Sequence, residues 1–178
     1  MRDYNAGTMN HYQRIALIMA ALALPSLSGC SMDAFRKQTP AQVTGEPETL
    51  KYADELKVDL SRMTRTASGL YYVDRTVGTG AVAEPGKIVS VGYVGTLASG
   101  YIFDQSGMGT PIQFTLGQAE VISGWDEGIA GMKVGGRRQL VIRPSLAYGN
   151  DSPGAGIPPN ATLVFEVELL DIVKPDAQ

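Results

Sequence analysis

The sequence has very few of the side chains on which most catalytic chemistry depends. Its 178 residues include one histidine, His11, and one cysteine, Cys30, both within the first 30 positions. Beyond those positions, a Ser-His-Asp triad, a Cys-His nucleophile, a His/Cys zinc site and an internal disulfide are excluded. The net charge of −3 also lacks the basic excess typical of nucleic-acid binders. We therefore expect a function that needs no metal and no nucleic-acid partner.

The first 30 residues are typical of a processed leader. Residues 15–27 form an uncharged, mostly apolar run after Arg14. A spanning helix needs roughly 20 apolar residues, so this shorter run fits the core of a signal peptide better. The run ends in Leu27-Ser28-Gly29-Cys30, which resembles a bacterial lipobox; a chance cysteine after an ordinary signal peptide, or a buried helix, is the alternative. The resemblance implies a lipid on Cys30, membrane attachment through it, and a place in the bacterial cell envelope, with Ser31 favouring the outer membrane.

The length indicates one principal domain behind a tether. A chain of 178 residues with 44% hydrophobic content can form one core-bearing domain but not two large ones. Residues 31–48 contain Pro40, Gly45 and Pro47 and have little periodicity, so they predict a flexible tether, and residues 49–63 could hold a short helix. We predict four segments, namely a signal peptide (1–29), a lipidated cysteine and tether (30–65), a domain (66–174) and a tail (175–178).

The domain itself is predicted to be mainly β-structure. Residues 161–170 alternate between apolar side chains and Glu166 and Glu168, which predicts a strand with one wet face and hence an antiparallel sheet. Further strands are predicted at 87–97, 112–116 and 137–143. One short amphipathic helix is indicated by the spacing of Val121, Trp125, Ile129 and Met132. The expected fold is α+β, with a strongly curved antiparallel sheet of about five strands wrapped over that helix.

Six segments in order resemble one known family. They are Val91-Gly-Tyr-Val-Gly-Thr-Leu97, Gly100-Tyr-Ile-Phe-Asp-Gln-Ser106, Val121-Ile-Ser-Gly-Trp-Asp-Glu-Gly128, Gly131-Met-Lys-Val-Gly-Gly-Arg137, Tyr148-Gly149 and the stretch from Gly156 to Leu170. Any one segment would be weak, but six with compatible spacing over residues 66–174 resemble an FKBP-type peptidyl-prolyl cis-trans isomerase from end to end. The resemblance implies an FKBP-like fold and an enzyme that accelerates X–Pro isomerisation in proteins folding outside the cytoplasm.

The resemblance also implies roles for individual residues. Trp125 would form the floor of a proline-binding slot, and its walls would be Tyr93, Phe103, Ile112, Val121, Ile122 and Phe165. Tyr148 would offer its hydroxyl, and Ile157 its backbone N–H, to substrate carbonyls, while Asp104 would orient Tyr93. Such a site makes no covalent bond and needs no cofactor. The implied partners are proline-containing unfolded or folding polypeptides, and macrolide inhibitors.

The residues alone leave other interpretations open. By periodicity, Trp125, Phe165 and Val121 are simply core residues, and Asp104 could close a loop. Ile112 and Gly156 depart from the family pattern and remove apolar surface near the substrate, which affects substrate preference and macrolide affinity more than activity. A second hypothesis is a membrane-anchored chaperone or surface-interaction module that holds proline segments with little turnover.

Overall fold

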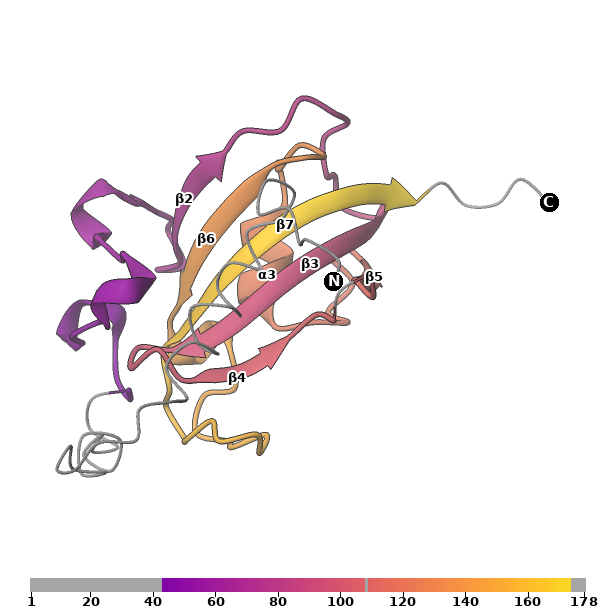
Figure 1. Cartoon of the computed structure of the whole chain (residues 1–178). Coiled ribbons are helices and arrows are strands. Elements are labelled where there is room, and N and C mark those ends of the chain that lie inside the picture. Colours follow the sequence, from indigo (N-terminus) through magenta and orange to yellow (C-terminus); the bar gives the residue numbers. More distant parts are fainter. Residues whose placement is uncertain (1–42, 108, 174–178) are drawn as a thin grey trace, which may run out of the picture. The chain divides into compact units, whose positions relative to one another are not determined.

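One antiparallel sheet and one α-helix make up most of the structure, a computed structural model that describes residues 43–107 and 109–173. Within these residues the sheet has seven strands in the order β1-β2-β6-β7-β3-β4, and β5 also pairs with β3 (Figure 1). The strands are β1 (Thr64–Arg65), β2 (Tyr71–Thr76), β3 (Ile88–Leu97), β4 (Ile102–Gln105), β5 (Ile112–Thr115), β6 (Arg137–Ile142) and β7 (Leu163–Val173). All pairings are antiparallel.

The two longest strands, β3 and β7, pair along their whole length and show why this sequence forms a sheet. Val91 pairs with Leu169 and Leu97 with Leu163, and all four side chains are buried in the main core. The alternate residues of β7 include Glu166 and Glu168 on the opposite face, as the period of two requires. The predicted fold class is therefore confirmed, and the sheet has more strands than the sequence indicated because short pairings such as β1–β2 carry no periodic signal.

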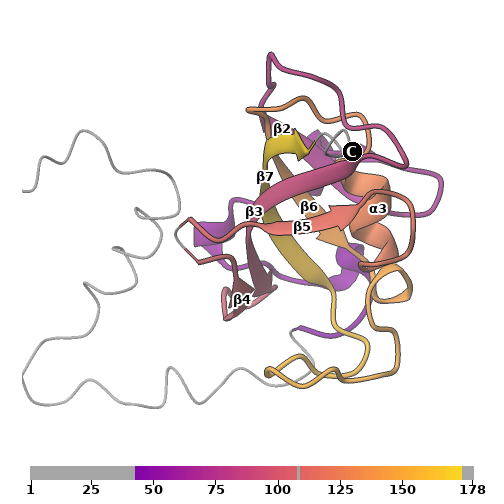
Figure 2. The ribbon, with the colours of Figure 1, turned by 90° about the vertical axis from the view of Figure 1, so that its right-hand side faces the viewer.

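The helix α3 (Ser123–Ile129) packs on one face of the sheet, which we call the helix face (Figure 2). Two glycines allow it to approach β6 closely. A Cβ at Gly124 would lie 2.5 Å from Ile142 Cγ2, and one at Gly128 would lie 2.7 Å from Leu140 Cδ2. The helix is shorter than the predicted spacing from Val121 to Met132, because Ala130 leaves the helical conformation and Gly131 follows with φ of +78°.

A buried arginine ties the end of α3 to the sheet. Arg138 on β6 is 8% exposed and forms two hydrogen bonds to the Asp74 carboxylate, at 2.7 and 3.1 Å. Its Nη1 also donates to the Gly128 carbonyl oxygen at 2.9 Å, and its guanidinium lies 4.4 Å from the centre of the Tyr72 ring. The buried charge is thus paired and hydrogen-bonded, which burial requires.

We call residues 43–63 the N-terminal segment. Val43 is buried in the main core, and side chains of residues 52–63 cover part of the opposite face of the sheet. In place of one short helix over 49–63, the segment has three short 3-10 helices, η2 (Pro47–Thr49), η3 (Asp54–Leu56) and η4 (Leu60–Arg62). A left-handed residue, Lys57 with φ of 49°, separates η3 from η4 and prevents a continuous helix.

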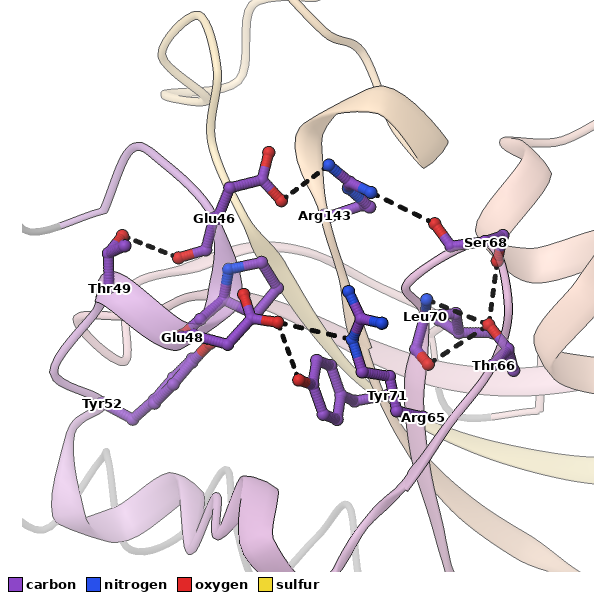
Figure 3. A network of polar contacts seen from close by, with 11 residues as sticks. Glu46, Glu48, Thr49, Tyr52, Arg65, Thr66, Ser68, Leu70, Tyr71 and Arg143 are labelled. Atoms are coloured by element: carbon purple, nitrogen blue, oxygen red, sulfur yellow. Dashed lines mark hydrogen bonds and ion pairs between the residues drawn. The ribbon is translucent and has the colours of Figure 1, made fainter.

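This segment is anchored by apolar and polar contacts. Tyr71, Val141 and Val164 on the sheet form a second buried cluster, packed against Tyr52, Leu56, Val58, Leu60 and Met63. Glu48 accepts a hydrogen bond from the Tyr71 hydroxyl and pairs with Arg65, and Glu46 pairs with Arg143 (Figure 3). Residues 43–48, which the sequence predicted as part of a flexible tether, are therefore in contact with the domain.

Candidate active site

Four aromatic rings meet at the centre of the helix face. The indole of Trp125, on α3, lies 4.9 Å from the Tyr93 ring and 5.2 Å from the Phe165 ring, both edge-on, and 5.9 Å from Phe114. Trp125, Phe165 and Phe114 are each 4% exposed, so all three belong to the core, as periodicity indicated for Trp125 and Phe165. Tyr93 is only partly buried and brings this cluster to the surface.

Phe103 extends the cluster toward solvent because of a bulge between β3 and β4. Gly95 pairs with Asp104 and Thr96 with Ile102, which leaves Phe103 as the extra residue. Its ring lies 5.6 Å from Phe165, edge-on. A Cβ at Gly95 would lie 2.7 Å from Phe165 Cε1 and 2.8 Å from Phe103 Cε2, so glycine is needed for the two rings to meet over β3.

Tyr93 joins the aromatic cluster to a carboxylate. Its hydroxyl donates a hydrogen bond of 2.6 Å to Asp104 Oδ2, while Asp104 Oδ1 accepts from the Gln105 N–H at 2.9 Å. Burial, and then the bond to Asp104, raise the pKa of Tyr93 above its usual value of 10. The phenol is thereby held protonated, with its proton directed at the carboxylate.

A second tyrosine lies near the same carboxylate. Tyr148, in the loop between β6 and β7, is 39% exposed, and its pKa is raised by burial and by the negative charge of Asp104. Within the described ranges its hydroxyl has no hydrogen-bond partner, so it can donate to a ligand.

Ile157, in the same loop, is buried in the main core at 4% exposure. Its N–H donates to the Gly154 carbonyl oxygen at 3.0 Å. The amide that the sequence assigned to a substrate carbonyl therefore already has an acceptor in this structure.

The three remaining wall residues lie around the same core. Ile112 on β5 pairs with Val91, and Val121 and Ile122 directly precede α3; all three are partly buried and packed against the main cluster. Ile122 caps the helix through its carbonyl oxygen, which accepts from the Trp125 N–H at 2.8 Å. Its own N–H makes no hydrogen bond to any described residue.

Sequence reasoning missed two residues of the cluster, Phe114 and Gly95. Phe114 could have been found from the alternation of Ile112, Phe114 and Leu116, which places all three on the core face of one strand. Gly95 has no comparable signal, because its role depends on two rings that approach it from β4 and β7.

Other features of the described part of the chain lie apart from the aromatic cluster. A groove of about 590 Å³ lies between the N-terminal segment and the β6–β7 loop, lined by residues that include Glu46, Pro144, Asn150 and Asn160. No three His, Cys, Asp or Glu side chains in residues 43–107 and 109–173 are placed to hold a metal ion. No helix in those residues is long and apolar enough to cross a membrane.

A curved antiparallel sheet wrapped over one short helix, with an aromatic cluster at its centre, defines an FKBP-like domain. The family model of FKBP-type peptidyl-prolyl cis-trans isomerases matches residues 80–170, half of the chain. The chain belongs to this family, and the predicted enzyme class is confirmed at that level.

Individual relatives agree with this assignment. FK506-binding protein 4 of Dictyostelium discoideum is 49% identical over 116 residues, 65% of this chain and 32% of that protein. The 46 kDa FK506-binding nuclear protein of Spodoptera frugiperda is 50% identical over 107 residues, 60% of this chain and 26% of that protein. The crystal structure of FkpA from Escherichia coli is similar with a TM-score of 0.58 and 42% identity, over 67% of this chain and 54% of that one. The chain thus spans about a third or less of the curated relatives it matches.

These relatives correct the predicted location. The curated relatives from Dictyostelium discoideum, Mycosarcoma maydis and Spodoptera frugiperda are eukaryotic FK506-binding proteins, one of them named as nuclear, and not lipoproteins of a bacterial envelope. The location in a bacterial envelope, with lipid anchoring to an outer membrane, is therefore wrong. Cys30 and the rest of the predicted leader lie outside the described residues, and lipidation of Cys30 stays a prediction from the sequence.

Proposed function

We propose that the protein accelerates cis-trans isomerisation of X–Pro bonds by binding the substrate at the rim of the aromatic cluster. The observation that supports this most directly is the continuity of the cluster. Tyr93 contacts Trp125 on its buried side and the Asp104 carboxylate through its hydroxyl. An apolar surface for a pyrrolidine ring thus lies beside polar groups that can act on the neighbouring amide.

The reaction requires no bond to be made to the substrate. Amide resonance sets the barrier to X–Pro rotation at about 20 kcal/mol, and the uncatalysed step takes tens to hundreds of seconds. A protein lowers this barrier if it binds the twisted amide more tightly than the planar one. In our proposal the proline ring packs against Tyr93, Phe103, Ile112, Val121, Ile122 and Phe165, above Trp125, which fixes the ring while the amide turns.

Two donors are suited to the carbonyl groups of a bound peptide. The Tyr148 hydroxyl and the Ile122 N–H have no acceptor among the described residues, unlike the Ile157 N–H, which is bonded to Gly154. We therefore assign hydrogen bonding to Tyr148 and Ile122, and an apolar supporting role to Ile157. Donors aimed at a carbonyl whose resonance is lost in the twisted amide stabilise that state selectively.

Asp104 acts in this proposal by holding Tyr93. A carboxylate that accepts a hydrogen bond of 2.6 Å from the Tyr93 hydroxyl fixes the ring that faces both Trp125 and the surface. Its charge also keeps the nearby Tyr148 protonated, since it raises the pKa of that phenol.

The proposed partners are proline-containing polypeptides. The names of the relatives add macrolides of the FK506 type, because those proteins are named as FK506-binding. A domain that covers residues 66–174 carries the site in this proposal.

The test is a proline tetrapeptide assay with the full chain, with and without a macrolide competitor. We expect faster cis-to-trans conversion, inhibited by the macrolide, and a several-fold loss of rate for Tyr148→Phe, which removes only a hydroxyl. Tyr52→Phe is the matched control, because the Tyr52 hydroxyl donates to Pro47 in the N-terminal segment. Rates equal to buffer at micromolar protein, together with retained macrolide binding, would leave a module that binds proline segments without turnover.

A further inference from the structure

Tyr101 is a large exposed side chain next to the candidate active site. It lies within one of the family motifs, but neither that motif nor the aromatic cluster gives it a role. It lies just before β4, two residues from Phe103, and is 44% exposed. Its backbone is fixed, because its carbonyl oxygen accepts from the Leu97 N–H at 2.9 Å. An exposed tyrosine with a fixed backbone suggests a contact surface.

The ring of Tyr101 rests on Gly156, in the loop between β6 and β7. A Cβ at position 156 would lie 2.9 Å from Tyr101 Cε1 and 3.1 Å from its hydroxyl oxygen. Gly156 also has φ of +77°, which L side chains rarely adopt. Tyr101 therefore fills the space that a side chain at position 156 would take, next to Ile157 and on the loop that carries Tyr148.

The N-terminal segment contacts both sides of this pair. On the Tyr101 side, the Ala53 N–H donates to the Ala98 carbonyl oxygen at 2.8 Å. On the Gly156 side, the Gly45 N–H donates to the Asn160 carbonyl oxygen at 2.8 Å, and Thr162 Oγ1 donates to Gly45 at 2.6 Å. One segment thus holds the turn before β4 and the end of the β6–β7 loop at the same time.

We propose that Tyr101 is a specificity-determining residue of the proposed isomerase site, where its ring contacts an apolar side chain adjacent to the substrate proline. The position supports this role, because Tyr101 joins the strand that carries Phe103 and Asp104 to the loop that carries Tyr148 and Ile157. The ring has no formal charge and offers an aromatic surface, which favours bulky apolar neighbours of proline over small or charged ones. This inference rests on the proposed function.

The test measures the selectivity of the full chain and its variants with two series of proline tetrapeptides. In the first series the residue before proline is alanine, leucine or phenylalanine, and in the second series the residue after proline is varied in the same way. For Tyr101→Ala we expect kcat/KM to fall about three- to tenfold for the leucine and phenylalanine peptides of one series, with little change for alanine. Tyr101→Phe should keep the wild-type preference, and Tyr101→Gln, which suits an exposed position, should lose it. Val77→Ala, at a side chain that is 69% exposed, is the control for removing exposed apolar surface elsewhere.

The outcomes separate this inference from the proposed function. If the wild-type chain has no isomerase activity with any peptide, the proposed function fails. If the wild type is active and both Tyr101→Ala and Tyr101→Gln, folded by circular dichroism, keep its ratio of leucine to alanine rates in both series, the role of Tyr101 is refuted. An equal loss for all peptides also refutes it, because that result indicates only a structural contribution.

Discussion

The hydroxyl of Tyr93 on β3 donates a 2.6 Å hydrogen bond to Asp104 on β4, beside the bulge in the pairing of these two strands. Tyr93→Phe keeps the ring against Trp125 and removes only this bond. One hydrogen bond contributes about 1 kcal/mol, so we expect kcat/KM to fall about fivefold with the fold intact.

The measurement is the tetrapeptide assay beside a far-ultraviolet circular dichroism spectrum. Asp104→Asn keeps an acceptor for the phenol and should lose less activity than Tyr93→Phe. Full activity in Tyr93→Phe would show that the Asp104 bond is not needed to hold the ring.

A glycine-to-alanine change in α3 should destabilise the protein, although alanine is the better helix former. At position 124 the added methyl group would meet Ile142 at 2.5 Å, and overpacking of this kind costs about 1–3 kcal/mol. Urea unfolding followed by circular dichroism measures the effect. Ser123→Ala, at the exposed start of the same helix, should change stability by less than about 0.5 kcal/mol.

The double variant Gly124→Ala with Ile142→Val tests the cause. Valine lacks the Cδ1 atom that would lie 2.9 Å from the new Cβ but keeps Cγ2, so the alanine should be less destabilising than it is in the single variant, with part of the loss remaining. A glycine variant as stable as the wild type would mean that the helix can move away from β6 without loss.

Glu166 should make stability depend on pH in the acidic range. It lies on the face opposite the helix, accepts a hydrogen bond from Gln139 at 2.8 Å and lies 3.8 Å from Arg75. Burial raises the pKa of Glu166 above its usual value of 4.5, against the smaller opposing effects of Arg75, Gln139 and Arg137. Its contribution to stability is therefore fully present below pH 4.5 and is lost as the pH rises through the folded-state pKa.

Glu166→Gln removes this titration. The variant should gain stability relative to the wild type between pH 4 and pH 7, because only the wild-type side chain must ionise in a buried place. Urea midpoints at each pH give the comparison, with the exposed Glu120→Gln as control. A difference in stability between Glu166→Gln and the wild type that does not change with pH would contradict the raised pKa of Glu166.

Removal of the N-terminal segment should weaken the domain. The predicted boundary at residue 66 stays a proposal, but a fragment that starts there lacks the side chains that cover Tyr71, Val141 and Val164. Exposure of buried apolar side chains costs about 1.5–3 kcal/mol each, so we expect a loss of about 3 kcal/mol or more against a fragment that starts at residue 43. Equal urea midpoints for the two fragments would show that the segment adds nothing to stability.

Much of the fold was predictable because its signals are local. Alternation in residues 161–170 and the spacing around Trp125 identify the longest strand and the helix without any partner. The family motifs then identify most of the aromatic cluster. The bond from Ile157 N–H to Gly154 depends on one turn geometry, which neither periodicity nor resemblance specifies.

Contacts between residues far apart in the chain could not be predicted from the sequence. Nothing in residues 43–63 shows that they pack on Val141 and Val164, about a hundred positions further along the chain. The contact of Tyr101 with Gly156 is of the same kind, because the missing side chain on one loop is replaced by a ring from another.

The chain contains a single tryptophan, and its indole nitrogen is buried without a hydrogen-bond acceptor among the described residues. When tryptophan is excited selectively, all of the fluorescence therefore comes from Trp125, whose indole lies in apolar surroundings beneath the proposed substrate site. Native emission should lie well to the blue of that in denaturant, and any molecule that settles above the indole should change its intensity. The protein thus carries its own fluorescent probe, with no label and no second indole to confuse the signal.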